Sequence, residues 1–281
     1  MDTTARPGVL PLRPLTVGEI LDAAVALLRT RALPLLGVGF VLAALEQALL
    51  YPMRSLSHMT PFYVPDDNHV TEWWATVSLG FGFEAMIIAL LGAIASAAAV
   101  PALVGPERAP AYGGSARRAT KIAVIAVVVG ALSAAGAAVL LLPWFAVYAF
   151  LGLAVPAAVI DRLGAARALG RSMGLNWRSG LRPGMIRILG YLGWLLFRLA
   201  LGIGGVAVIE FIPGLDTVVD DPLLLPSIAW LLVNTVAYPT LACLDAVLHL
   251  EARMRVEGLD LTLGRTLRRG TSIEQAFAVV R

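Results

Sequence analysis

The sequence is poor in the residues that build most catalytic and metal sites. Its 281 residues include one cysteine, Cys243, and three histidines, and only 15% of them are charged. A single cysteine excludes an intrachain disulfide and a cysteine-based metal cluster. The H-E-x-x-H zinc motif, the Walker loop and a strand-borne G-x-G-x-x-G are also missing, so we expect no metal and no cofactor.

Apolar residues, in contrast, make up 58% of the chain, and the mean hydropathy is +0.80. This is more than the core of a soluble protein of this length can bury. Blocks with the roughly 17 to 25 apolar residues of a bilayer span occur at residues 32–51, 75–103, 122–142, 144–160, 185–209 and 223–248.

These blocks predict the fold class and the domain organisation. We expect an all-α, polytopic membrane protein with six transmembrane helices and amphipathic helices on one membrane face. The whole chain forms a single integral membrane domain, 1–281. It divides into an N-terminal segment (1–31), a six-helix bundle (32–248) and a tail (249–281).

The third and fourth spans depend on one division of a long apolar block. Residues 122–160 are almost continuously apolar and about twice as long as one span requires. Pro143 and Trp144 lie in the middle. Because proline ends or kinks helices and tryptophan favours the headgroup level, we predict a tight helical hairpin at residues 142–145.

Basic residues are distributed unevenly around these spans. With six spans, 20 of the 22 Lys and Arg residues lie on one side of the membrane, Arg54 lies on the other, and Arg198 lies within a span. The positive-inside rule then predicts cytoplasmic termini in a bacterial inner (plasma) membrane. Orientation explains these bases, and contact with anionic lipid headgroups is a second role for them, so no nucleic-acid partner is expected.

Two segments on the predicted cytoplasmic side have the pattern of short interfacial helices. Residues 16–30 begin with Thr16 three residues before Glu19, which is the spacing of a capping box. Residues 162–177 place Arg167 and Arg171 one helical turn apart. We expect both segments to be amphipathic helices at the membrane surface.

Ionisable residues inside the spans are costly, about 3 kcal/mol for an arginine at mid-bilayer. Arg198 lies about 18 Å beyond the cytoplasmic start of the fifth span, and Glu84 has a similar depth in the second. We therefore predict an Arg198–Glu84 ion pair inside the bundle, with Glu46 and Asn234 as neighbours. The pair either lines a polar path for a proton, an ion or a lipid headgroup, or it fixes helix packing.

Other motifs have simpler explanations. Residues 170–174 match the G-x-S-x-G pattern, but a nucleophilic serine needs a strand-to-helix turn, and Ser172 lies in a helical, arginine-rich segment. His58, His69, Asp66, Asp67 and Glu72 share a predicted outer loop without a compact ligand spacing. We expect neither catalysis nor metal binding there.

Small residues and prolines predict local features of the spans. Gly92 with Ser96, and Gly130 with Ala134, have the four-residue interval that lets helices approach closely. We expect kinks at the helix-internal prolines, which are Pro101, Pro156 and Pro239.

Patterns near both ends of the chain carry a family resemblance. The segment RPLTVGEILD (13–22) followed by Arg29, the segment ALGRS (168–172) and the tail HLEARMRVEGLD (249–260) resemble the bacterial glycerophosphoryl diester phosphodiesterase membrane-domain family. His249 and Glu251 depart from the family, which has tyrosine and aspartate there. The tail residues that carry the resemblance are His249, Glu251, Arg253, Arg255, Glu257, Gly258 and Asp260.

The resemblance implies a membrane accessory role and no reaction, because the membrane region occupies the whole chain. In the tail, Glu251 and Arg255 have the i, i+4 spacing of an ion pair, and Gly258 can end the helix in a left-handed conformation.

Two function classes remain open. The first is a non-catalytic accessory or scaffold in a membrane complex or a lipid-related process, with the bilayer and a membrane protein as partners. The alternative is a small transporter or channel with a polar path at Arg198, Glu84 and Glu46. A path that reaches those residues would favour transport, whereas a tightly packed bundle with an apolar lateral face would favour a scaffold.

Overall fold

The computed structural model describes residues 9–58, 68–110, 115–204, 221, 223–269 and 271–277. Every regular element in these residues is a helix. Six helical segments are long and apolar enough to cross a membrane, so the chain has the all-α, multi-pass architecture that its hydropathy predicts. The predicted end of the fifth span, 205–209, lies outside the described residues.

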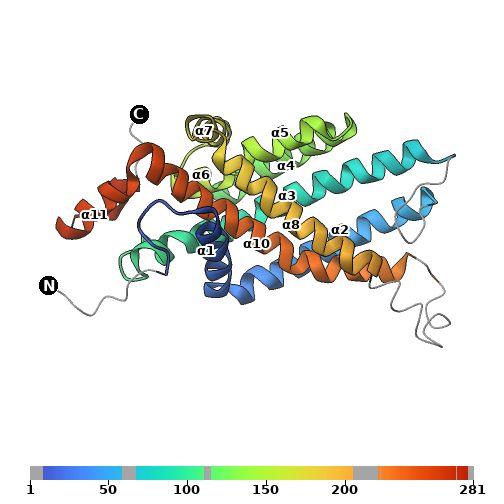
Figure 1. The fold of residues 1–281 in the computed structure, drawn as a ribbon, viewed down its shortest axis with the longest axis horizontal. Helices are drawn as coiled ribbons and strands as arrows, with labels where there is room; N and C mark the ends of the chain where they lie inside the picture. Colours follow the sequence, from blue (N-terminus) through green and yellow to red (C-terminus); the bar gives the residue numbers. More distant parts are fainter. Residues whose placement is uncertain are drawn as a thin grey trace.

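The six segments form an elongated bundle (Figure 1). They are α2 (Ala32–Leu56), α3 (Val70–Val104), α4 (Ala116–Ala138), α5 (Leu142–Leu151) followed by α6 (Ala154–Ile160), α8 (Arg182–Leu199) followed by the π-helix η1 (Ala200–Gly204), and α10 (Leu224–Glu257). At 35 and 34 residues, α3 and α10 are about 50 Å long and exceed the hydrocarbon thickness of a bilayer.

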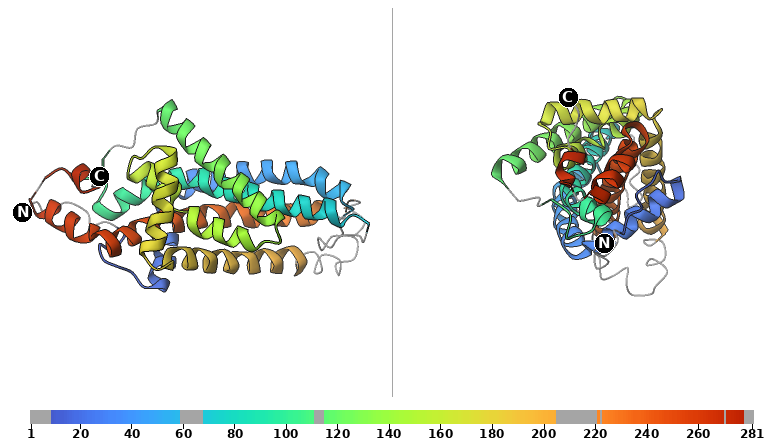
Figure 2. Two further views of the ribbon diagram at one scale, coloured as in Figure 1. Left: turned by 90° about the horizontal axis from the view of Figure 1, so that it is seen from above. Right: turned by 90° about the vertical axis from the view of Figure 1, so that its left-hand side faces the viewer.

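Four shorter helices lie toward one end of the bundle. α1 (Val17–Thr30) and α7 (Ala165–Arg178) lie across the long helices, and α11 (Leu259–Arg269) extends beyond them, with α12 (Ile273–Phe277) after it (Figure 2). We call this the termini end, and the opposite end the loop end. The capping box of α1 is confirmed: the Thr16 side chain accepts from the Glu19 N–H, and the Glu19 carboxylate accepts from the Thr16 N–H.

The hairpin between the third and fourth spans lies earlier than predicted. The turn comprises residues 139–141, where Leu140 and Leu141 have φ values of 55° and 63°. Pro143 lies in the first turn of α5, where the missing N–H has no helical partner to lose. Trp144 is buried inside the protein against Phe81.

The fourth span is interrupted at Gly152 and Leu153, between α5 and α6. Pro156 explains the break because it has no N–H to donate to the carbonyl of residue 152. The hydroxyl of Ser172, in α7, accepts from the Leu153 N–H (3.1 Å) and donates to the Phe150 carbonyl (2.5 Å). The serine of the G-x-S-x-G pattern therefore caps a broken helix.

Glycines allow the closest helix crossings. A Cβ on Gly82 of α3 would lie 2.8 Å from the Ala134 Cβ of α4, and a Cβ on Gly130 would lie 2.9 Å from the Met86 Cβ. The predicted Gly130–Ala134 interval thus lies at a helix crossing. Around Gly92, in contrast, a Cβ would have ordinary contacts, 3.5 Å from Val155.

Candidate functional site: a polar cavity within the bundle

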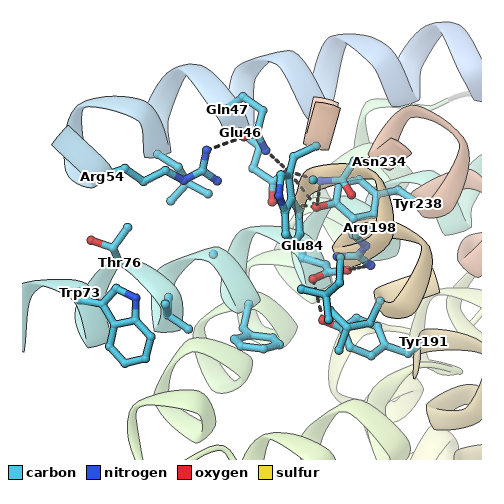
Figure 3. Close-up of a pocket in the computed structure, with 18 residues that line it drawn as sticks. Glu46, Gln47, Arg54, Trp73, Thr76, Glu84, Tyr191, Arg198, Asn234 and Tyr238 are labelled. Atoms are coloured by element: carbon cyan, nitrogen blue, oxygen red, sulfur yellow. Dashed lines mark hydrogen bonds and ion pairs between the residues drawn. The ribbon is translucent and has the colours of Figure 1, made fainter. Parts of the chain in front are cut away.

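A cavity of about 250 Å³ lies between α2, α3, α8, η1 and α10 (Figure 3). It extends from Arg54 and Trp73, near the loop end, to Glu46, Glu84 and Arg198 in the middle of the bundle. Its walls are largely apolar and aromatic and include Leu50, Val77, Phe81, Leu195, Leu199 and Trp230. Arg198, Glu84, Glu46 and Asn234, which the sequence predicts to lie inside the membrane, therefore line this cavity.

Arg198 and Glu84 form the ion pair predicted from their depths. The Arg198 guanidinium donates to the Glu84 carboxylate, and the Tyr191 hydroxyl donates to the other Glu84 oxygen at 3.0 Å. Arg198 is 2% exposed and Glu84 is 5% exposed. The guanidinium carbon also lies 5.2 Å from the Tyr191 ring centroid, within cation–π range.

Glu46 and Asn234 form a second polar group in the cavity, joined by Tyr238. The Asn234 amide donates to the Tyr238 hydroxyl (2.7 Å) and to Glu46 (3.3 Å). The Tyr238 hydroxyl lies 2.9 and 2.8 Å from the two Glu46 oxygens and donates to the carboxylate. Glu46 is 4% exposed, so this carboxyl group is removed from bulk solvent.

Two polar atoms at the inner end of the cavity lack a hydrogen-bond partner among the described residues. They are Nε of Arg198, which is a donor, and Oδ1 of Asn234, which is an acceptor. Both residues line the cavity. Because buried polar groups are nearly always paired, these two unpartnered atoms distinguish the inner end of the cavity from an ordinary packed interior.

The end of the fifth span adds an unusual backbone feature beside Arg198. The helix changes to the π-helix η1 two residues after Arg198. Gly202 of η1 packs against Trp230, where an added Cβ would lie 2.9 Å from the indole nitrogen. Such π-helical turns occur frequently at functional sites.

Arg54, the exception to the charge asymmetry, belongs to the cavity rather than to a solvated loop. It lies in the last turn of α2 and is buried. Its guanidinium donates to Gln47 (2.7 Å) and to the Ser227 hydroxyl (3.1 Å). The positive-inside count treats such a base only as an orientation signal and cannot reveal this position.

A second buried ion pair was not predicted from the sequence. Arg187 of α8 donates through two nitrogens to Asp245 of α10, at 2.6 and 3.1 Å, and both side chains are buried. Arg187 also donates to the Tyr148 carbonyl and lies 3.6 Å from that ring centroid. Arg187 is one of the 20 bases that the charge count places on one side of the membrane, and the sequence signal for the pair is Asp245, an acid inside an apolar block.

Aromatic rings separate the two ion pairs. Trp144, Tyr148 and Tyr191 contact one another with ring centroids 4.9 to 5.0 Å apart. Tyr191 contacts Glu84 on the cavity side, whereas Tyr148 contacts Arg187 on the other side. The cavity therefore ends at packed rings before the termini end.

The family-like tail residues form polar networks at the termini end. Asp161 accepts from Arg253 (2.8 Å) and Arg171 (3.2 Å) and contacts Nε2 of His249 (3.1 Å). Burial alone would raise the pKa of Asp161, but His249, Arg253 and Arg171 together lower it. Arg171 and Arg253 also pair with Glu257.

The second network fixes the N-terminal segment to the tail. Glu251 pairs with Arg255, as the i, i+4 spacing predicts, and it also pairs with Arg182. Both arginines donate to the Leu15 carbonyl, at 2.9 and 2.8 Å. Gly258 ends α10 at φ 63°, the predicted left-handed stop, and Asp260 lies in the first turn of α11.

The remaining sequence candidates do not form a site in the described residues. The rings of His58 and His69 lie 4.4 Å apart, while Asp66 and Asp67 lie outside the described residues. In the described part of the chain, no group of three or more His, Cys, Asp or Glu side chains could hold a metal ion.

Comparisons with protein families, with curated protein sequences and with solved structures found no match to this chain. The geometry of the cavity is therefore the basis for a functional proposal.

Proposed function

We propose that this multi-pass membrane protein binds a small amphipathic molecule in the cavity and belongs to the class of small transporters and channels. The observation that carries the proposal is a space of about 250 Å³ that ends at Arg198, Glu84 and Glu46. Ligand pockets combine apolar walls with a few converging polar groups, and they lie between the helices of bundles. Arg198, Glu84, Glu46 and Asn234 are the converging polar residues that line the inner end of the cavity.

The accessory or scaffold function is the second candidate. It is the role implied by the resemblance to the glycerophosphoryl diester phosphodiesterase membrane-domain family, and membership of that family is itself a proposal. Exposed apolar side chains on α2 and α8, such as Leu45 and Leu196, provide a lateral face for a protein partner. A lipid-facing helix has the same exposed residues without any partner. The cavity combines apolar walls with converging polar groups, so we favour ligand binding.

The proposal includes an orientation with the termini end in the cytoplasm of a bacterial cell. Exposed bases support it, because Arg29 of α1, Arg167 of α7 and Arg268 of α11 lie at that end. These bases are also suited to anionic lipid headgroups. The cavity then approaches the outer face of the membrane.

Filling the cavity tests the function. Gly80 lines the cavity, and an added Cβ would meet only Leu50, at an ordinary 3.7 Å. A Gly80→Phe substitution should therefore occupy the cavity without displacing the backbone. We expect native mass spectrometry of protein purified in mild detergent to show a bound small molecule on the unmodified protein and none on Gly80→Phe.

The matched control is Gly37→Phe on α2, an exposed position where an added Cβ meets nothing within 4 Å. This variant should keep the bound molecule. A molecule that stays bound to Gly80→Phe, or its absence from the unmodified protein, would contradict the proposal and favour the accessory function.

A further inference from the structure

The two acids of the cavity have different partners. Glu84 receives a charged hydrogen bond from Arg198 and a neutral one from Tyr191. Glu46 receives hydrogen bonds from Tyr238, Asn234 and Gln47, all of which are neutral donors. In the described residues, no cationic group lies within ion-pair distance of Glu46. The charge of Glu84 is balanced, whereas that of Glu46 is not.

This difference matters because both acids are inside the bundle. An ionised carboxylate away from water costs several kcal/mol unless a cation and hydrogen bonds compensate it. Protonation removes that cost for Glu46, whereas for Glu84 it would break the ion pair with Arg198. A proton added to this cavity therefore binds more favourably to Glu46.

The charged and titratable groups around Glu46 come from four helices. Arg54 belongs to its own helix α2, Glu84 to α3, Arg198 and Tyr191 to α8, and Tyr238 to α10. Glu84 disfavours a negative charge on Glu46, whereas Arg198 and Arg54 favour it, since all three residues line the same cavity. Arg198 is already bound to Glu84, so that its favourable effect on a Glu46 charge is offset by Glu84.

Asn234 can serve both states of Glu46. In the observed orientation its Nδ2 donates to the carboxylate at 3.3 Å, and its Oδ1 has no partner in the described part of the chain. Turning the amide by 180° exchanges the two atoms, so that Oδ1 accepts from the Tyr238 hydroxyl where Nδ2 donates to it in the observed orientation. The Tyr238 hydroxyl, which donates to the Glu46 carboxylate in the observed orientation, then accepts from the O–H of a protonated Glu46.

We propose that Glu46 is the proton-binding residue of the cavity and takes up its proton from the loop end. The cavity supplies the route, since it extends from Arg54 to Glu46 and is closed beyond Tyr191 by packed rings. The role of the proton, as a coupling ion for the bound molecule, rests on the proposed ligand-binding function. The binding of a proton by Glu46 does not depend on that function.

Infrared difference spectroscopy of the protein in lipid nanodiscs tests the site directly. We compare spectra between two pH values that both lie above the ordinary pKa range of exposed carboxylic acids, in the region where a protonated carboxylic acid absorbs. The unmodified protein should show a carboxylic C=O band, and Glu46→Gln should lose it. Glu46→Asp should retain a band, and Tyr238→Phe should shift it to higher frequency because one hydrogen bond to the carboxyl group is lost.

The control is Glu72→Gln, an exposed acid in the first turn of α3, which should leave the band unchanged. A band that survives in Glu46→Gln, or no band in the unmodified protein at any pH, would overturn the assignment. The outcome is separable from the ligand test. If protein without a cavity ligand still shows the Glu46 band, the proton site is supported and the proposed ligand-binding function is contradicted.

Discussion

Buried charges in this protein differ in how completely each is compensated. Arg187 and Asp245 form a bidentate pair, and Arg198 and Glu84 form a pair supported by Tyr191. A bidentate pair is geometrically complete and is best explained as part of the packing. The second pair leaves Nε of Arg198 buried and unpartnered in the described residues, and Arg198 lines the cavity.

Arg198 and Glu84 allow the structural and functional roles to be separated. Arg198→Leu should destabilise the protein by about 3–5 kcal/mol, because it leaves Glu84 ionised and buried without its cation. Replacing both residues by leucine should recover most of that loss. Thermal unfolding followed by fluorescence in detergent measures both variants.

The double variant also decides between the two roles of the pair. If it regains stability and still binds the cavity molecule, the pair serves only to fix the helices. If it regains stability but no longer binds, the pair contacts the ligand. A single Arg198→Leu variant that is as stable as the unmodified protein and still binds the cavity molecule would contradict both roles.

Helices in this bundle are positioned by small residues and by breaks, rather than by strong apolar patterning. Gly39 of α2 approaches Pro239 of α10, where an added Cβ would lie 2.8 Å from the proline ring. Gly152, at the break in the fourth span, leaves room for Arg187, since an added Cβ would lie 2.2 Å from Nε. Without strong hydrophobic forces between helices in lipid, such close backbone contacts decide how they pack.

The α3–α4 crossing should therefore be sensitive to side-chain size. Gly82→Leu should cost about 1–3 kcal/mol, because the new side chain overlaps Ala134 and the Gly130 carbonyl. Gly193→Leu is a matched control on α8, since that glycine is exposed and an added Cβ meets nothing within 4 Å. Equal melting temperatures for the two variants would show that this crossing does not limit stability.

The two ends of the molecule differ in their polar groups and in their packing. The termini end holds the Asp161 and Glu251 networks, which fix α10 to α7, to α8 and to the N-terminal segment. The cavity lies toward the loop end and stops at the rings of Tyr148 and Tyr191. Passage of a ligand through the bundle would require these rings to separate, whereas binding from the loop end alone would not.

Orientation can be measured with single cysteines in a Cys243→Ala background. Asn68→Cys lies at the loop end, and Ser115→Cys and Thr271→Cys lie at the termini end; all three positions are exposed. In intact cells, a membrane-impermeant thiol reagent should label position 68 alone, because the basic termini end is expected to be cytoplasmic. Labelling at 115 and 271 but not at 68 would reverse the orientation and direct the cavity toward the cytoplasm.

The sequence by itself determined the number of spans and the depths of their charged residues. Hydropathy measures the length of apolar segments, and the helical rise converts residue number into depth, so the contact between Arg198 and Glu84 was predictable. The capping box of α1 and the Gly258 stop of α10 were also predictable, because each depends on a few neighbouring residues.

Only the tertiary structure decided which residues surround those charges. Tyr191 and Tyr238 bind the two cavity acids from positions 107 and 192 residues away in the chain, and an uncharged tyrosine in an apolar block gives no sequence signal. In the sequence, Arg187 follows the pattern of a base in a loop, but in the structure α8 places it against Asp245. The rotation of each helix about its axis determines these contacts, and that rotation depends on close packing between distant segments rather than on local sequence.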